Sequence, residues 1–224
     1  IGQYQDFTQP DLLNMIKAAM LDIIGENGFI AVPTFTFNFP KGDDFDVDNT
    51  PSDRMGIFAE FIRKYDGSNR TSHPIHSISI LGKNSDHIAG LEGNTEFSES
   101  SAFDFLLKTN CKILFLGDSF TETFFHIAEE KAKVPYRFWK TFKGDLIKNS
   151  LKKKIEIKYF ARNFEENPKP SIDVPKLFEF LDGKNIFSKT NNKKVNLMIC
   201  SSNSYVDNCL IKLNENPRFF LKVY

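Results

Sequence analysis

The stretch CKILFLGDSFTETFFHIAEE, residues 111–130, joins a strand pattern to a helix pattern. Its first seven residues form a short apolar run, which is typical of a buried strand, and a Ser/Thr-rich turn follows Gly117. From about residue 121 onward, apolar side chains recur at helical spacing. A strand that leads directly into a helix is the repeating unit of α/β folds. This stretch therefore indicates an α/β fold.

Strand and helix patterns alternate on both sides of this stretch. Before it, a helix is predicted from residue 8 to near Gly25, with Pro10 in its first turn, and further helices over 50–67 and 100–110. Strands are predicted over 29–37 and 75–82. After it, strands are predicted over 152–160 and 195–201, and helices over 174–185 and 204–217. This interleaving predicts an α/β fold with a mixed β-sheet flanked by helices. We interpret residues 1–224 as a single domain, in which the polar stretch 163–173 is a hinge to a smaller C-terminal portion.

Capping and burial follow from the same patterns. The helix over 50–67 is expected to start at Thr50 or Ser52, because their hydroxyls can accept from free backbone amides. The strand over 29–37 is expected to be buried and to end, or to become a sheet edge, at Pro33. The strand over 75–82 alternates in polarity, so it is expected to be half-buried.

The composition excludes some classes of function. The chain has 29 basic and 29 acidic side chains, so its formal net charge is zero. A nucleic-acid-binding chain needs a clustered excess of Lys and Arg, so we expect no nucleic-acid partner. We interpret the basic stretch at 148–158, KNSLKKKIEIK, as a solvated strand edge rather than a phosphate patch. The 24 phenylalanines predict an aromatic-rich core.

The sequence gives no signal for a membrane or for export. No apolar run approaches the length of a membrane span, and no signal peptide is visible. The three cysteines (Cys111, Cys200 and Cys209) lack C-x-x-C spacing, which favours buried thiols in a reducing cytoplasm. Because the chain starts with Ile1 instead of methionine, we expect it to be truncated or incompletely observed at its N-terminus.

His126 is the main candidate for catalysis. Glu129 and Glu130 follow it by three and four positions, so either carboxylate can lie on the same helix face. A lone histidine in a helix is often a core residue, and that interpretation stays open on spacing alone. The alternative is a general base whose orienting carboxylate is one of the two glutamates. The turn before the helix could also hold an anion or an oxyanion.

Two other polar segments could belong to a site. RTSHPIHS, residues 70–77, has two histidines three positions apart, but the intervening proline and the lack of a third ligand nearby argue against zinc. The acidic run contains Asp43, Asp44, Asp46 and Asp48 without the spacing of a calcium loop. It is either a solvated loop or a negative lip for a cationic substrate. We therefore expect no metal cofactor.

Taken together, these segments resemble the aminoglycoside 3-N-acetyltransferase family. GFIAVPTFTF (28–37) is similar to the family's G-x-x-[FIV]-x-x-P-T-x-[ST] strand. Residues 45–82 resemble its D-x-x-x-T-P-S-x-M-G…E-x-[FL]-R…G…R-S-x-H-P-x-x-S segment. Residues 113–130 resemble its [IL]-L-L-L-G…N-T-x-x-H-x-A-E signature, with VPYR following at 134–137. The match runs in order over most of the chain.

The resemblance implies acetyl transfer from acetyl-CoA to an amine. The motif histidine falls on His126 and the motif glutamate on Glu129, which makes them the expected catalytic residues. The segments at the strand ends are expected to bind the cofactor through Thr34, Ser72, His76 and Ser77. The acidic loop is expected to bind a cationic small-molecule acceptor through Asp46 and Asp48. Further copies of the chain, in a homo-oligomer, are a compatible partner.

The chain departs from the family pattern near the expected acceptor site. Glu122 stands where many members have asparagine, Phe37 and Asn38 replace a frequent tryptophan, and SESSAF (98–103) replaces a turn richer in glycine and proline. Only the tail of the family's upstream H-S-S-L stretch is present. The acceptor implied is therefore either an aminoglycoside, as in antibiotic resistance, or an amino sugar of surface-polysaccharide synthesis.

Two other classes of function remain as alternatives. A hydrolase would use Ser119 or Thr121 with His126, but the sequence has no G-x-S-x-G nucleophile elbow. A non-catalytic binding protein could keep the same fold, although such a protein would have no need for both His126 and Glu129. No motif cysteine accompanies the histidine, which agrees with direct transfer from the thioester.

Overall fold

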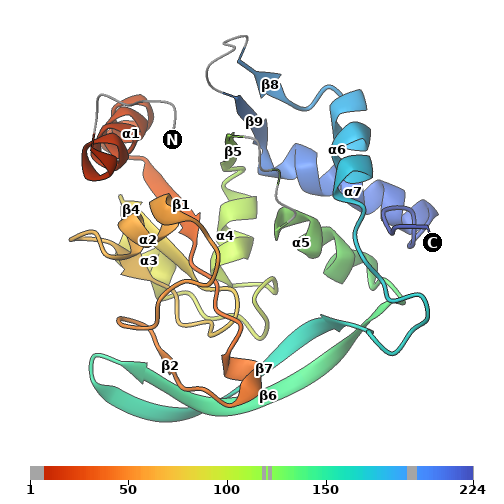
Figure 1. Cartoon of the computed structure of the whole chain (residues 1–224), viewed down its shortest axis with the longest axis horizontal. Coiled ribbons are helices and arrows are strands. Elements are labelled where there is room, and N and C mark those ends of the chain that lie inside the picture. The colour runs from red at the N-terminus through yellow and green to blue at the C-terminus, as the bar shows by residue number, and fades with distance from the viewer. Residues whose placement is uncertain (1–7, 118–119, 121–122, 191–195, 224) are drawn as a thin grey trace. The chain divides into compact units, whose positions relative to one another are not determined.

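The computed structural model describes residues 8–117, 120, 123–190 and 196–223 (Figure 1). The chain divides into two compact units, each with a β-sheet of its own. Unit 1 comprises the residues up to 96 together with 100–102 and 141–157. Unit 2 comprises 97–99, 103–140 and the residues from 158 onward. The expected hinge at 163–173 therefore lies inside unit 2.

Helices and strands alternate along the described chain, which confirms the predicted α/β class. The helices are α1 (Gln9–Ile24), α2 (Ile57–Arg63), α3 (Ser85–Ala89), α4 (Ala102–Lys108), α5 (Thr123–Ala132), α6 (Val174–Gly183) and α7 (Ser202–Glu215), with a 3-10 turn η1 (Phe39–Lys41). The strands are β1 (Phe29–Pro33), β2 (Phe45–Asp46), β3 (Asn69–Arg70), β4 (Ile78–Gly82), β5 (Lys112–Leu116), β6 (Arg137–Lys148), β7 (Leu151–Arg162), β8 (Ser188–Lys189) and β9 (Leu197–Ser201). No helix in this part of the chain is both long and apolar enough to cross a membrane.

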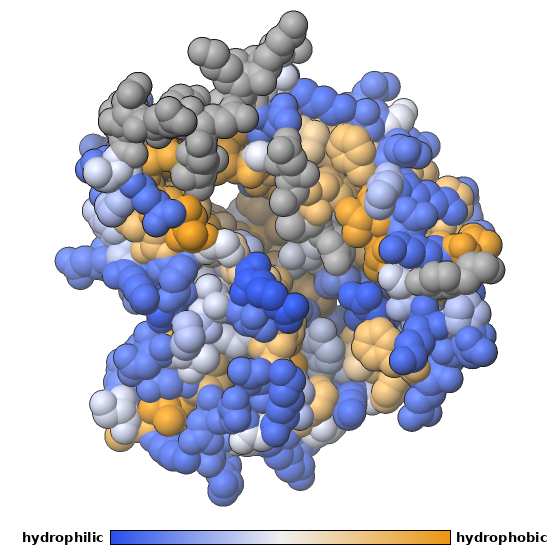
Figure 2. All heavy atoms as spheres, in the orientation of Figure 1, coloured by the Kyte–Doolittle hydropathy of each residue, from blue (hydrophilic) through white to orange (hydrophobic). Residues whose placement is uncertain are grey.

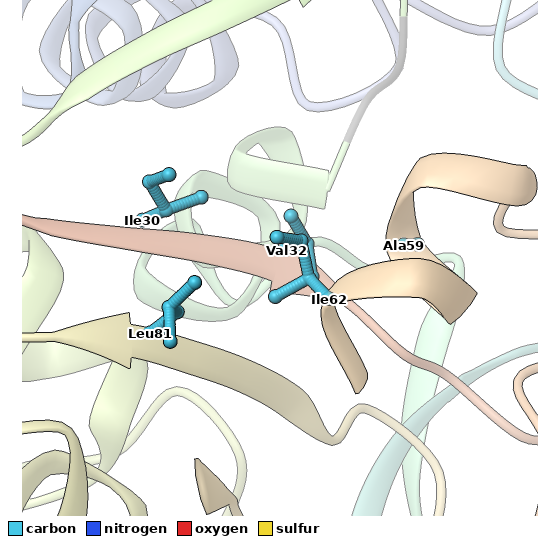
Figure 3. Close-up of a cluster of buried hydrophobic side chains, with 5 residues drawn as sticks. All are labelled: Ile30, Val32, Ala59, Ile62 and Leu81. Atoms are coloured by element: carbon cyan, nitrogen blue, oxygen red, sulfur yellow. The ribbon is translucent and has the colours of Figure 1, made fainter. Parts of the chain in front are cut away.

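The first sheet of unit 1 is antiparallel, with the strand order β1-β4-β3. Side chains of β1, β4 and α2 form one core cluster: Ile30, Val32, Ala59, Ile62 and Leu81 (Figure 3). Gly82 ends β4 at a φ of +118°, and a Cβ at that position would come within 2.6 Å of the Gly28 carbonyl oxygen. Only glycine therefore allows the close approach of β1 and β4 at this end of the sheet.

The expectation of a half-buried strand over 75–82 is wrong. All residues from Ile78 to Leu81 are buried. Both α2 and α3 pack against β4, so the polar face of the strand is covered as well as the apolar face. Its serines, Ser79 among them, are satisfied by hydrogen bonds inside the unit instead of by water.

The predicted start of the second helix is also wrong. Helix α2 begins at Ile57, and its N-cap is Gly56, which makes no side-chain cap. Arg54 and Gly56 both have positive φ angles, of 58° and 86°, which keep the preceding residues out of helical geometry. Thr50 and Ser52 have other roles: Thr50 accepts from the Asp46 amide, and Ser52 donates to Glu60.

A long hairpin of β6 and β7 carries the basic stretch. Sequence reasoning predicted only part of β7 and missed β6. The two-residue turn between the strands, Asn149 and Ser150, has φ angles of 50° and 62°, as a type I′ hairpin turn requires. Parallel pairing of β2 with β6 adds a third strand, and Phe39, Phe45, Val47 and Leu146 form the core beneath it.

The basic stretch on this hairpin is a solvated, ion-paired surface, as predicted. Lys152 pairs with Asp145 and Asp44, and Lys154 also pairs with Asp145. Hydrophilic side chains dominate the hairpin on the face shown in Figure 2. Two of its lysines thus already have carboxylate partners, which disfavours a phosphate patch.

Unit 2 combines the antiparallel sheet β5-β9-β8 with the packed helices α5 and α7. The predicted aromatic core is confirmed: Phe120 packs against Phe115, Phe178, Phe187 and Tyr205. The expectation that residues 111–117 form a buried strand is wrong, because only Phe115 of β5 is buried. The reason is that β5 is an edge strand, and Leu114 and Leu116 on it are 38% and 40% exposed.

Candidate active site

Glu129 lies at the centre of a buried polar cluster in unit 2. It is one helical turn after His126 on α5 and is completely buried, while the His126 side chain keeps 15% of its surface exposed. The His126 Nδ1 atom lies 2.5 Å from Glu129 Oε2. The carboxylate that contacts the histidine is therefore the one three positions along the chain. Glu130, four positions along, is half-buried on the same helix.

Two further residues bind the same carboxylate. The chain leaves α5 through Lys133, whose φ is 49°, and then enters β6. This turn brings the Tyr136 hydroxyl to 2.8 Å from Glu129 Oε1 and Arg137 Nη2 to 2.7 Å from Oε2. Sequence reasoning assigned no role to either residue. Both belong to the VPYR motif at 134–137, which was used only to align the chain with the family and could have pointed to them.

The charge of Glu129 determines which ring nitrogen of His126 carries the proton. Burial raises the pKa of this carboxyl, but the charges and hydrogen bonds of His126 and Arg137 outweigh burial and hold it at about 2. Glu129 is thus ionised near neutral pH and has no proton to donate. The 2.5 Å contact then requires a proton on His126 Nδ1. In neutral His126, the lone pair is consequently on Nε2.

Arg137 also attaches this cluster to the hairpin. Its Nη1 atom donates to the Phe160 carbonyl of β7 at 2.8 Å. On α5, Phe125 is fully buried and packs edge-on against Phe220. His126 is therefore carried by a helix fixed on one side by packing and on the other by a buried ion pair. Such support restricts the rotamers of the imidazole.

Most of the turn before α5 lies outside the residues that the structure describes. Ser119 and Thr121, the nucleophiles of the hydrolase alternative, lie outside the described residues. Glu122, which replaces the frequent asparagine, lies outside them too. The proposed anion site in this turn remains an expectation from sequence.

Thr34 and Ser77, two expected cofactor-binding residues, lie together in unit 1. Both are fully buried where β1 ends and β4 begins. The Ser77 hydroxyl donates to the Thr34 carbonyl at 2.7 Å, and the Thr34 hydroxyl donates to the Ser77 carbonyl at 3.2 Å. Their hydroxyls therefore hold two strands together.

Ser72 and His76, the other two expected cofactor-binding residues, flank Pro74. Ser72 is half-buried, and its hydroxyl is 3.5 Å from Lys148 Nζ. His76 is buried beside Phe35, and its Nδ1 atom lies 3.3 Å from Glu96 Oε1. Sequence reasoning missed Glu96, which stands in a loop with no motif.

The same carboxylate faces a second histidine. His73 Nε2 is 3.6 Å from Glu96 Oε2, and burial lowers the pKa of His73 to about 4. Burial would raise the pKa of Glu96, but its hydrogen bond with His76 and the nearby imidazoles lower it. Within the described residues, no group of three or more His, Cys, Asp or Glu side chains is arranged to hold a metal ion.

The carboxylates of the acidic loop make ion pairs and hydrogen bonds that stabilise the conformation of the loop. Asp44 pairs with Lys152 at 2.7 Å, and Asp46 accepts from the amides of Asp48 and Asn49 at 2.9 and 3.0 Å. Asp48 accepts from the Asn149 amide of the hairpin turn at 3.0 Å. Asp46 is half-buried and Asp48 exposed, so both carboxylates still reach solvent.

Asp48 also lines a polar pocket of about 850 Å³ within unit 1. The wall combines loop residues, α2, α3, β3 and the hairpin turn, and its charged members are Asp48, Arg63, Lys64, Arg70, Asp86 and Lys148. A volume of this size suits a polar ligand as large as a sugar or a nucleotide.

A sequence model of the aminoglycoside 3-N-acetyltransferase family matches residues 11–212 of the chain. Among solved structures, the YokD protein from Bacillus subtilis has 20% identity and a TM-score of 0.76 over 92% of this chain and 81% of its own. Sisomicin-bound AAC-VIa has 17% identity and a TM-score of 0.77 over 92% and 85%. AAC-IIIb in a binary complex with CoASH has 18% identity and a TM-score of 0.76 over 91% and 83%.

Proposed function

Since the chain belongs to the aminoglycoside 3-N-acetyltransferase family, a family of acetyl-CoA-dependent enzymes, we propose that it acetylates an amino group of an aminoglycoside or a related amino sugar, with His126 as general base. The observation that carries this proposal is the 2.5 Å contact between His126 Nδ1 and the buried, ionised Glu129. A core histidine needs no ionised carboxylate beneath it. A general base does, because its own proton must stay on Nδ1, facing the carboxylate, so that Nε2 can accept the substrate proton.

The proposed reaction is direct transfer. Acetyl-CoA is already activated as a thioester, so no covalent acyl-enzyme is required. His126 Nε2 removes a proton from the acceptor ammonium, and the amine nitrogen then attacks the thioester carbonyl carbon. As the tetrahedral intermediate collapses with cleavage of the carbon–sulfur bond, the attacking nitrogen loses its second proton to the departing sulfur, so the products are the amide and the CoA thiol. The proton that His126 took from the ammonium then passes to solvent, so charge and protons balance.

Glu129 stabilises the imidazolium that forms during this step. Its own charge is in turn held in place by Arg137 and Tyr136, at 2.7 and 2.8 Å. Because these donors are preorganised, little reorganisation is needed when His126 becomes charged. Tyr136 serves only as a hydrogen-bond donor, since burial and the Glu129 charge raise the pKa of its hydroxyl.

For acetyl-CoA, we propose a channel lined by the segment 70–77, with Thr34, Ser72, His76 and Ser77 shaping its wall. The CoASH complex of AAC-IIIb supports CoA as the product of this reaction class. Crystals soaked with CoA should show density beside β4 and not beside the lysines at 152–154. Density confined to those lysines would contradict the assignment.

For the acceptor, we propose the acidic loop around Asp46 and Asp48. The structures of AAC-VIa with sisomicin and of AAC(3)-IVa variants with a gentamicin or with apramycin support a cationic amine. Partly exposed carboxylates attract an ammonium-bearing sugar, and this attraction weakens as ionic strength rises.

The double variant Asp46→Asn, Asp48→Asn tests this assignment. Asparagine keeps an oxygen for the loop's amide hydrogen bonds but removes the charge. KM for a polyamine acceptor should rise about tenfold, while KM for acetyl-CoA stays nearly unchanged. Asp66→Asn, an exposed carboxylate elsewhere in unit 1, is the matched control. A fall in KM would instead indicate an acceptor with phosphate groups, such as a nucleotide-linked amino sugar.

The experiment that tests the function itself is a screen of amines for thiol release from acetyl-CoA. Aminoglycosides and amino sugars should be compared at matched concentration, with the N-acetylated product identified by mass. Thiol release without an acceptor would favour the hydrolase, and binding without thiol release would favour the non-catalytic protein. The free cysteines Cys111, Cys200 and Cys209 fit our proposal of a reducing cytoplasm as its location.

A further inference from the structure

Arg70 is the first residue of the segment RTSHPIHS, and it has no part in the chemistry proposed for His126. Its side chain is almost completely buried, with 7% of the residue exposed. Within the described residues its hydrogen bonds go to no carboxylate. The acceptors are the Thr34, Val47 and Thr50 carbonyls and the Ser77 hydroxyl.

These four acceptors belong to three separate segments. Arg70 Nη1 donates to Thr50 O at 2.5 Å and to Val47 O at 3.3 Å, both in the acidic loop. Nη2 donates to Thr34 O at 2.5 Å, at the end of β1. Nε donates to Ser77 Oγ at 3.1 Å, at the start of β4. One guanidinium thus joins the proposed acceptor loop to the proposed cofactor segment.

A second arginine contacts the same loop but not the strands. Arg63 on α2 donates from Nη1 to Asp48 O at 2.8 Å, and its other nitrogens pair with Glu60. Loop carbonyls are therefore directed toward two cations whose side chains are buried. The carbonyl directions fix the backbone of residues 47–50 and with it the position of the Asp48 side chain. Arg63 offers a comparison, since it acts on the loop alone.

A buried cation without a carboxylate partner is costly, so net stability is a weak reason for its presence. Arginine also does what lysine cannot: its planar fork bonds several acceptors in fixed directions, whereas an ammonium is a point charge on a flexible stem. The Arg70 guanidinium carbon lies over the ring of Phe45, 4.9 Å from its centroid, which adds a cation–π contact to the hydrogen bonds.

We infer that Arg70 is a positioning residue that holds the acidic loop against the ends of β1 and β4, so that it sets the binding of acceptor and of acetyl-CoA together. This inference rests on the proposed function, because it takes the loop and the strand ends as the two binding segments. Arg70 itself touches neither the reacting amine nor the thioester.

The test compares Arg70→Lys and Arg70→Met with Arg63→Met, and uses Arg54→Met as the control on an exposed side chain. Arg70→Met loses all four hydrogen bonds and Arg70→Lys loses the fixed fork that makes them, so both variants should raise KM for sisomicin and KM for acetyl-CoA about tenfold or more. In Arg63→Met only KM for sisomicin should rise. Arg70→Lys keeps the positive charge but not the planar guanidinium. Equal effects of the lysine and methionine variants would therefore show that the hydrogen-bonding geometry of the guanidinium, and not its charge, positions the loop.

Amide hydrogen exchange separates failure of this inference from failure of the proposed function. The amides of residues 47–50 should exchange about tenfold faster in the folded Arg70 variants, whether or not wild-type protein acetylates sisomicin. Unchanged loop exchange, or an Arg70→Lys variant that behaves as wild type, would overturn the inference. Loss of folding in both Arg70 variants would also overturn it, because Arg70 would then serve overall stability.

Discussion

His126→Ala should lower kcat by about two to four orders of magnitude with the fold intact, which is the range for removing a general base. The histidine is carried by a helix whose packing comes from other side chains, such as Phe125. Glu129 keeps Arg137 and Tyr136 as partners after the substitution. The loss should therefore appear in kcat rather than in the thermal unfolding midpoint.

Steady-state kinetics with the best acceptor from the screen, together with circular dichroism, check this result. His87→Ala is the matched control, because His87 is an exposed histidine at the end of α3. A folded His126→Ala variant with near-normal turnover would remove the general-base assignment. Raising the pH should partly restore its rate, since hydroxide can then deprotonate the ammonium in solution.

The parts of the fold that follow local rules could be predicted from the sequence. Pro10 near the start of α1 and Gly25 at its end mark that helix, and the predicted and observed bounds agree closely. The i,i+3 spacing of His126 and Glu129 predicted a contact, and the structure shows it at 2.5 Å. Spacing alone could not choose between Glu129 and Glu130, because both lie within reach on a helix.

The parts that depend on tertiary packing could not be predicted. Ser79 lies on the same face of β4 as Leu81, which packs against Ala59 and Ile62 of α2, and no period in the sequence records that this face is covered. The 12-residue strand β6 reads as a mixture of aromatic and charged residues, and its pairing with β2 becomes visible only in the sheet. In the sequence Arg70 is only one position of a motif, because its four hydrogen-bond acceptors come from segments that are distant along the chain.

The same limit applies to the candidate site. Tyr136 and Arg137 lie seven and eight positions beyond Glu129, after a turn with a positive φ, so no helical or strand period connects them. Glu96 reaches His73 and His76 from a loop. A carboxylate that is buried and ionised needs several donors, and the sequence shows the carboxylate without showing which distant donors the fold will supply.

Glu129→Gln should also lower kcat about a hundredfold or more, because the amide can place its NH₂ group against His126 Nδ1. That hydrogen bond would put the imidazole proton on Nε2 and remove the lone pair that accepts the substrate proton. The uncharged amide also no longer favours the imidazolium, so the acid limb of the pH–rate profile should move to lower pH. Glu130→Gln should change little, and a greater sensitivity at Glu130 would show that the motif register is wrong.

Stability gives an independent measurement of the same ion pair. Glu129→Ala leaves the buried Arg137 without its counter-charge and should cost about 3–5 kcal/mol in the free energy of unfolding near neutral pH. The pKa of Glu129 falls from an ordinary value of 4.5 to about 2 in the folded chain, so its contribution is present above about pH 4.5 and is lost as the pH falls toward 2. The difference in unfolding free energy between wild type and Glu129→Ala, measured in urea, should therefore shrink as the pH falls from 4.5 toward 2. A difference that stays constant down to pH 2 would mean that Glu129 is not held as a buried anion, and the support of His126 by a charged partner would then be lost.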